Sequence, residues 1–380
     1  MVTYYLDHAA TTPVRSVAIE TMTKLLADGL GNPSGAHRLA RAATRVLDDA
    51  RENMADALGA QPGEVVFTAG GTEADNLALF GVLEASGGVA VCSAIEHHAV
   101  IDPVEHRGGR VVAVNPDGQI DLEALAEALG ADVSIVSVML ANNETGILQP
   151  LAAIADLVRE HAPNAALHTD AVQAFSWIDL AEVAQVADMI SVSAHKFGGP
   201  PGVGALVVRA GTPMAAQIRG GGQERGRRSG TQNVPGIAAM VAAATEMVAE
   251  REHEVARVGS LRDRLADGLR AQVSGVVESG VGADADRSTK TANVCHVCIE
   301  NIESEALLFL LEKDDVLASA AASCSSGAME PSHVLAAMGY SRELAFGSLR
   351  LSLGYPSTDD DIDAVLAALP PAVERLRECS

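Results

Sequence analysis

Short runs of β-branched residues alternate with helix-like stretches from about residue 64 to residue 209. The apolar runs read EVVFTA, GGVAVCSA, RVVAVNP, VSIVSVML, ADMISVSA and VGALVVR, and stretches such as DLEALAEALG and PLAAIADLVREHA lie between them. Strands that alternate with helices favour a mostly parallel sheet covered on both faces. The sequence therefore predicts an α/β fold. Ligands of such sheets bind beyond the carboxyl ends of the strands, so the loops after these runs are where chemistry is expected.

A second unit follows this alternating region. The glycine-rich, charged segment GGGQERGRRSGTQN covers residues 220–233, and a long helical pattern that begins near Pro235 links it to the rest of the chain. The later words NVCHVCIE and SLRLSLG read as strands of a smaller α+β domain. We expect a large α/β domain that binds a cofactor over residues 16–250, and a smaller α+β domain formed by residues 1–15 and 251–380.

The charge balance limits the partners of the chain. Among 380 residues, 27 are Lys or Arg and 50 are Asp or Glu, which gives a net charge of −23. This excess argues against direct binding of nucleic acid or of an anionic membrane. No apolar run is long enough to cross a membrane, and the N-terminus lacks the pattern of a signal peptide. The sparse, odd set of five cysteines favours free thiols in a reducing cytoplasm, with buried positions expected for Cys92, Cys295 and Cys298.

One lysine stands out from the others. The chain has only four, at Lys24, Lys196, Lys290 and Lys313. Three have the charged or polar neighbours that are typical of solvated lysines, whereas Lys196 follows the strand-like run ADMISVSA and precedes FGGPPGVGA. It could simply close a strand. Because Ser193, His195 and a glycine-rich loop flank it, we favour an amine that contacts a ligand, and a Schiff-base lysine needs such a desolvated site.

Loops after neighbouring strands hold further candidates. Gly70, Gly71 and Thr72 form a turn into a helix, where free N–H groups and a hydroxyl suit a phosphate. The same residues could form an ordinary helix cap. Asp170 stands where another strand ends, with Gln173 three residues on. Its carboxylate could hold a proton on a heteroaromatic nitrogen or cap a helix, and the sequence leaves both pairs of alternatives open.

Two polar pairs are ambiguous in the same way. Asn142 and Asn143 could be turn residues or amide ligands. His97 and His98 could cap a helix or bind a metal ion. Adjacent histidines point in different directions, and no third ligand has a sensible spacing, so we expect no metal site.

Taken in order, these words resemble the cysteine desulfurases, pyridoxal-phosphate enzymes of the class V aminotransferase family, and among them the first of two groups. The matching words span residues 4 to 354 and read YLDHAATTP, GNPSGAH, FTAGGTEADNLA, EHHAV, ANNETG, HTDAVQ, SAHKFGGPPGVGAL, GGGQERGRRSGT, SCSSGAMEPSHVL and SLRLSLG. The resemblance implies a fold-type-I transferase, a homodimer with shared sites, and pyridoxal 5'-phosphate as the cofactor.

The resemblance also implies a role for each cofactor-binding position. Lys196 would form the internal aldimine, Asp170 would pair with the pyridinium nitrogen, and His97 would stack on the ring and shuttle protons. The 3-oxygen side of the ring would be contacted by Asn143 and Gln173. The phosphate would be held by Gly71, Thr72, Ser193 and His195, while Thr231 would reach the phosphate of the other subunit.

Substrate handling follows from the same resemblance. Arg350, with Asn32, would bind the carboxylate of L-cysteine, which a planar guanidinium fits in a bidentate way. Cys324 lies in the small, polar stretch ASAAASCSSGAMEPS and would take the sulfur as a persulfide, leaving L-alanine. A protein acceptor would then receive the sulfur for iron–sulfur cluster assembly, tRNA thiolation or DNA sulfur modification.

Alternatives remain open at this point. The same fold and cofactor serve aminotransferases and selenocysteine lyases, and a silent relative could act as a scaffold in a sulfur-transfer complex. The chain also departs from common family wording. His8 stands where Asn is frequent, Gly35 where a second Ser is frequent, Ala194 where Gly is frequent, and AAASC replaces a more usual SGSAC. None of these changes removes a chemical group on which the assignment depends.

Overall fold

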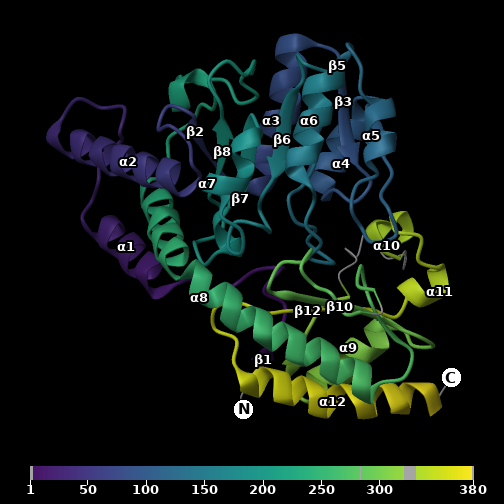
Figure 1. Cartoon of the computed structure of the whole chain (residues 1–380). Helices are drawn as coiled ribbons and strands as arrows, with labels where there is room; N and C mark the ends of the chain where they lie inside the picture. The colour runs from purple at the N-terminus through teal and green to yellow at the C-terminus, as the bar shows by residue number, and fades with distance from the viewer. Residues whose placement is uncertain (1–2, 283, 321–330, 379–380) are drawn as a thin grey trace.

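The computed structural model describes residues 3–282, 284–320 and 331–378. Figure 1 shows two parts, an upper one built on a large sheet and a lower one built on a small sheet, with the long helix α8 (Val234–Gln272) running along both. The N-terminal segment and the C-terminal helix lie together in the lower part.

The large sheet has seven strands in the order β2-β8-β7-β6-β5-β3-β4. Only β8 is antiparallel to its two neighbours, and the other strand pairs are parallel. The prediction of a mostly parallel α/β sheet is therefore confirmed. The strands are β2 (Val65–Thr68), β3 (Val89–Ser93), β4 (Arg110–Val112), β5 (Val133–Ser137), β6 (Ala166–Asp170), β7 (Met189–Ser193) and β8 (Gly204–Val208).

Helices cover both faces of this sheet, which explains why its strands are continuous apolar runs. Val65 and Phe67 of β2 pack into one buried cluster and Val66 into another, because successive side chains of a strand point to opposite faces. The helices are α1 (Ser16–Ala27), α2 (Arg38–Ala57), α3 (Gly71–Ser86), α4 (His98–His106), α5 (Leu122–Ala128), α6 (Leu151–His161) and α7 (Leu180–Val183).

The lower part has an antiparallel sheet in the order β12-β10-β9, beside a short parallel pair of β1 and β11. Its core joins distant segments, since Leu6 packs with Val297, Leu351 and Leu369. The elements are β1 (Tyr4–Tyr5), β9 (Val276–Glu278), β10 (Val294–Ile299), β11 (Val316–Leu317), β12 (Ser348–Ser352), α9 (Ser304–Lys313), α10 (His333–Ala337), α11 (Arg342–Ala345) and α12 (Asp359–Glu378).

Helix α8 serves both cores without a break. Its first half, up to Met247, packs in the cluster under the large sheet, and its second half, from Val258, packs in the core of the lower part. The change from one core to the other thus falls inside a continuous helix. The domain limits 16–250 and 251–380 cut through that helix and stay a prediction.

Three expectations about individual side chains can be compared with the structure. Cys92, Cys295 and Cys298 are buried free thiols, as expected. The expectation that Lys290 is solvated is wrong: it is 5% exposed, its Nζ lies 3.6 Å from Glu278 and donates to the carbonyl of Ser279. The buried carboxylate of Glu278 is the charged partner that makes this burial possible.

Within the described ranges, no helix has the length and apolar character needed to cross a membrane.

Candidate active site

A cavity of about 370 Å³ opens where the loops after β2, β3, β5, β6 and β7 meet, between the two parts of the molecule. Most of its wall comes from the carboxyl ends of the large sheet, as this fold class favours. Arg350 of β12 and Ser319 reach it from the lower part. The lining brings together the following predicted residues: Gly71, Thr72, His97, Asn143, Asp170, Gln173, Ser193, His195, Lys196 and Arg350.

Lys196 ends a 3-10 turn that follows β7 directly. Its Nζ donates to the carbonyl oxygens of Ala9 and Ala10, at 2.6 Å and 2.8 Å. Burial, helped by the charge of Arg350, lowers the pKa of the Lys196 amine to about 8. A substantial share of this amine is therefore neutral near physiological pH, which is the form that attacks a carbonyl carbon.

The start of α3 forms an anion-binding end of the cavity. Gly71 and Thr72 occupy its first turn, where backbone N–H groups lack helical partners. A Cβ atom on Gly71 would lie 2.8 Å from Cγ2 of Val172, so only glycine fits. Glu73 does not occupy this end, because its carboxylate accepts hydrogen bonds from Arg228 Nε at 2.7 Å and from the Ala69 N–H.

Ser193 and His195 stand opposite that helix end. Ser193 closes β7, and the Nδ1 atom of His195 lies 3.3 Å from the Thr11 hydroxyl. Burial and the charge of Lys196 lower the pKa of His195 to about 4. His195 is therefore a neutral hydrogen-bonding group at neutral pH, and the favourable charge for an anion comes from the helix end.

Asp170 and His97 face the middle of the cavity. Asp170 is the last residue of β6, is 5% exposed, and accepts a hydrogen bond from the Val172 N–H at 2.8 Å. Burial raises the pKa of Asp170, and the positive charges of His97 and Lys196 oppose that shift. His97 caps α4, with Nδ1 accepting from the Ala99 N–H at 3.0 Å. In the neutral ring the proton therefore sits on Nε2.

The structure separates the two adjacent asparagines. Asn142 is a turn residue, since its Oδ1 accepts from the N–H groups of Glu144 and Thr145 and its Nδ2 donates to the Ile95 carbonyl. Asn143 lines the cavity instead. The sequence left open whether these residues are turn residues or ligand-binding amides. Asn142 is a turn residue, and Asn143 is placed to contact a ligand.

Arg350 is the cation on the opposite wall. It is 5% exposed, with Nη1 donating to the Asn143 carbonyl at 2.9 Å and Nη2 donating to Asp7 at 2.7 Å. Its Nε has no hydrogen-bond partner within the part of the chain that the structure describes. The guanidinium is thus held in place by two contacts and keeps donors for a ligand carboxylate.

Three predicted residues do not join this arrangement. Asn32 is exposed, its Oδ1 accepts from the Ser34 N–H, and it does not line the cavity beside Arg350. Thr231 is also exposed and absent from the lining. Cys324 lies outside the described residues. The roles of these three residues stay predictions.

Sequence reasoning missed Asp75. This residue of α3 is 1% exposed and lines the cavity, and its Oδ1 has no hydrogen-bond partner among the residues described. Burial raises its pKa well above the usual range. Because Asp75 lies three residues after Thr72, helical spacing puts both on one face, and that spacing was the available signal.

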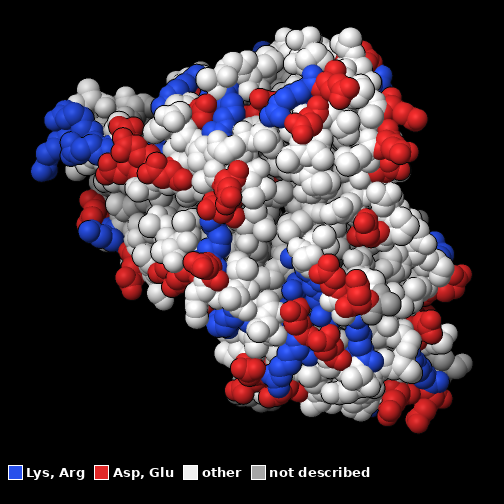
Figure 2. All heavy atoms as spheres, viewed as in Figure 1, with Lys and Arg blue, Asp and Glu red and all other residues white. Residues whose placement is uncertain are grey.

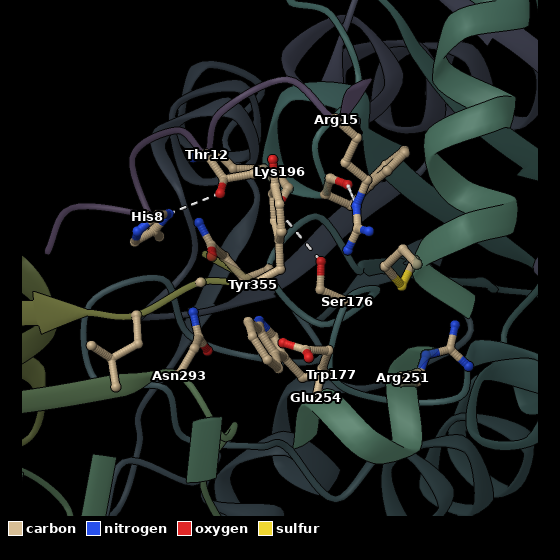
Figure 3. A pocket seen from close by; sticks show the side chains of 15 residues that line it. His8, Thr12, Arg15, Ser176, Trp177, Lys196, Arg251, Glu254, Asn293 and Tyr355 are labelled. Atoms are coloured by element: carbon tan, nitrogen blue, oxygen red, sulfur yellow. Dashed lines mark hydrogen bonds between the residues drawn. The ribbon is translucent and has the colours of Figure 1, made fainter. Parts of the chain in front are cut away.

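The cavity fits pyridoxal 5'-phosphate. Its volume lies in the range of small-molecule sites, whereas a second cavity on the other side of Lys196 measures only about 30 Å³ (Figure 3) and has room for water but not for a cofactor. The partly neutral amine of Lys196 suits the aldehyde of the cofactor, and the buried carboxylate of Asp170 suits its ring nitrogen. The N-terminus of α3 suits its phosphate. The absence of a side chain at Gly71 lets the start of α3 pack closely against Val172 and Ser193.

Comparison with known proteins agrees with this geometry. The family described as Aminotransferase class-V matches residues 4–365. The chain belongs to this family. Its fold is therefore that of the fold-type-I enzymes, and its cofactor is pyridoxal 5'-phosphate, which confirms both predictions.

Relatives match over the full length. An IscS-like cysteine desulfurase of Mycobacterium tuberculosis is 43% identical, covering 99% of this chain and 98% of the relative. A cysteine desulfurase of Cereibacter sphaeroides is 41% identical, covering 99% and 97%. Among solved structures, a NifS-like protein matches with a TM-score of 0.89 and 33% identity over 98% of this chain and all of the other. DndA from Streptomyces lividans matches with a TM-score of 0.75 and 36% identity, covering 92% and 99%.

Proposed function

We propose that this protein is a cysteine desulfurase, which converts L-cysteine to L-alanine and takes the sulfur onto Cys324. The observation that carries the proposal is the cavity in which Lys196, Asp170, His97 and Arg350 meet at the start of α3. Full-length relatives that bear this name support the same conclusion.

The large part of the molecule would hold the cofactor. Lys196 would bind it covalently, Asp170 would pair with its ring nitrogen, and the start of α3 would hold its phosphate with Ser193 and His195. When bound, pyridoxal 5'-phosphate supplies an electron sink that weakens bonds at the α-carbon and, through it, the carbon–sulfur bond of cysteine.

The other residues bind the substrate and move protons. Arg350 would orient the substrate carboxylate, because Asp7 and the Asn143 carbonyl already fix the plane of its guanidinium. An amine with a pKa of about 8, as on Lys196, both accepts and releases a proton near neutral pH. His97 carries its proton on Nε2, since Nδ1 is occupied by the Ala99 N–H, and it would exchange that proton with the substrate.

Cys324 would collect the sulfur. Its thiolate attacks the substrate sulfur, so that the substrate carbon–sulfur bond breaks and a sulfur–sulfur bond forms on the enzyme, while a proton completes the alanine methyl group. Ser319 lines the cavity and Cys324 follows five residues later. Five extended residues span at most about 17 Å, so chain length permits this approach.

A homodimer with shared sites is part of the proposal. Large apolar side chains are exposed at Ile19 and Leu26 of α1, Leu39 of α2 and Ile218, and α1 and α2 extend from one side of the molecule in Figure 1. The exposure of these side chains supports a subunit interface on this side of the molecule. Thr231 would then serve the site of the other subunit. Sedimentation that finds only an active monomer would overturn this part.

The acceptor of the sulfur is proposed to be a protein in the cytoplasm, without direct binding of nucleic acid. Figure 2 shows acidic and basic side chains intermixed on the visible face, with one basic group over the outer end of α2. Arg38, Arg41 and Arg45 are exposed there. The net charge of −23 opposes a wide phosphate-binding surface.

The test uses Cys324→Ser on the holoenzyme, with Cys379→Ser as the matched control. We expect Cys324→Ser to lose persulfide and sulfide formation and to keep the absorbance of the bound cofactor, while Cys379→Ser stays active. Full activity of Cys324→Ser with cysteine would disprove the persulfide step. A wild-type protein that takes up no cofactor would instead indicate a scaffold, and transfer of the amino group to a 2-oxoacid would indicate an aminotransferase.

A further inference from the structure

Glu144 is a buried carboxyl group that the proposed reaction does not use. It is 4% exposed and directly follows Asn143 in the wall of the cavity. Its Oε2 accepts a hydrogen bond from the Ser332 hydroxyl at 2.5 Å, across 188 positions of the sequence. Burial raises the pKa of Glu144 to about 7, and the hydrogen bond from Ser332 and the charge of Arg350 oppose this shift.

The direction of this hydrogen bond is fixed by the other contacts of Ser332. Ser332 caps α10, and its Oγ accepts from the N–H groups of Val334 and Leu335 at 3.1 Å and 3.3 Å. The hydroxyl proton therefore remains for Glu144. One buried hydroxyl both begins a helix and binds the loop that carries Asn143.

The next residue makes a second link of the same kind. His333 Nε2 donates to the Glu96 carbonyl at 2.9 Å, and its ring lies 5.0 Å from the ring of His98. Glu96 and His98 flank His97. Ser332 and His333 thus bind two different loops, each of which presents a side chain to the cavity.

Helix α10 has apolar packing that does not depend on these links. Val334 packs with Ile95 and Met139, and Leu335 packs with Cys298 and Ala345. Figure 1 shows α10 between the upper and lower parts. Removing one hydrogen bond therefore leaves a helix that is still seated by its apolar face.

We propose that Glu144 and Ser332 are a positioning pair for sulfur transfer, which fixes the chain that returns after Cys324 onto the loop of Asn143. This inference rests on the proposed function. Ser332 follows Cys324 by eight residues, and Ser319, five residues before Cys324, lines the same cavity. Described residues on both sides of Cys324 in the sequence thus lie at or beside the cavity wall.

The first experiment compares Glu144→Met with Glu144→Gln in the holoenzyme. Methionine fills similar space and accepts no comparable hydrogen bond, so kcat for alanine formation should fall about tenfold, since small misplacements of reacting groups are costly. KM for cysteine and the cofactor absorbance should remain at wild-type values. Glutamine keeps an oxygen that accepts from Ser332, so Glu144→Gln should retain a kcat close to that of the wild type.

A second comparison separates the link from helix capping. Ser332→Ala loses both the hydrogen bond to Glu144 and the cap of α10. Ser341→Ala loses only a cap, because Ser341 accepts from the Leu344 N–H at the start of α11 and, among the described residues, is not bonded to the cavity loops. Ser332→Ala should lower kcat and speed hydrogen exchange of residues 331–338, and Ser341→Ala should leave kcat unchanged.

The outcomes are distinct. Wild-type kcat in both Glu144→Met and Ser332→Ala overturns the positioning pair, and so does equal loss in Glu144→Gln and Glu144→Met. A wild-type enzyme that forms no alanine from cysteine overturns the proposed function instead.

Discussion

The two walls of the cavity are built differently. The wall from the large sheet presents Asp170 at the end of β6 and Lys196 on the short turn after β7, and burial shifts the pKa of both groups. The wall from the lower part presents Arg350, whose guanidinium is already paired with Asp7. The first wall holds groups with shifted pKa values, and the second holds a guanidinium whose orientation is already fixed. We therefore expect substitutions in the first wall to affect cofactor chemistry and those in the second to affect the substrate.

The largest effect is expected for Lys196→Ala. Loss of the amine removes the covalent link and the proton carrier together, so alanine formation should fall by about 10³-fold or more. Turnover and the absorbance of the bound cofactor measure the change. Lys313→Ala is the control, since that lysine lies in the last turn of α9. If Lys196→Ala keeps wild-type turnover, the wall from the large sheet does not carry the cofactor chemistry.

Arg350→Ala should mainly weaken substrate binding. Charge-assisted hydrogen bonds contribute about 1.5–3 kcal/mol, which corresponds to a rise of about 10- to 150-fold in KM for cysteine. Cofactor absorbance should persist. Steady-state kinetics with Arg350→Lys, which restores charge but not the planar fork, should give an intermediate KM. Cofactor loss in Arg350→Ala would show that the lower wall also holds the cofactor.

The lowered pKa of Lys196 predicts a pH dependence of stability in the cofactor-free protein. The folded pKa, about 8, lies below the ordinary value of 10.5, so the unfolded chain binds more protons between these values. Wild-type stability should therefore rise with pH from about 8 to 10.5 relative to Lys196→Met. Thermal unfolding across that range measures it. If the difference in stability between the wild type and Lys196→Met does not change with pH, the pKa of the Lys196 amine is not lowered.

Arg228→Ala should have the smallest effect. It frees Glu73 near the start of α3, where a negative charge competes with a phosphate. Such helix-end effects are about 0.3–1 kcal/mol, so cofactor affinity should fall about two- to fivefold. Titration of the cofactor-free protein measures this. The double variant Arg228→Ala with Glu73→Gln should recover the affinity, and no recovery would rule out the electrostatic cause.

Sequence analysis predicted cavity residues correctly where they follow the regular strands of the large sheet. Because parallel strands end at one edge, a residue that follows an apolar run was expected near the cavity, and Asp170 and Lys196 lie there. Asn142 and Asn143 lie in a turn after β5, where no strand period assigns side chains to faces, so their different roles needed coordinates.

Long-range partners could not be predicted. The expectation that Lys290 is solvated was wrong because the fold brings it, from the loop before β10, against Glu278 at the end of β9. Sequence analysis did not single out Glu144, whose partner Ser332 lies 188 positions away. The position of Asn32 was also not predicted, since it lies outside the cavity wall.

The uninterrupted course of α8 restricts how this molecule can work. A rotation of the upper part against the lower would have to bend the helix between Met247 and Val258, because its two halves are locked into separate apolar interiors. Opening the cavity by a large hinge motion would therefore require the free energy needed to bend α8. We therefore expect α8 to keep the two walls of the cavity in one relative position while substrate enters and product leaves.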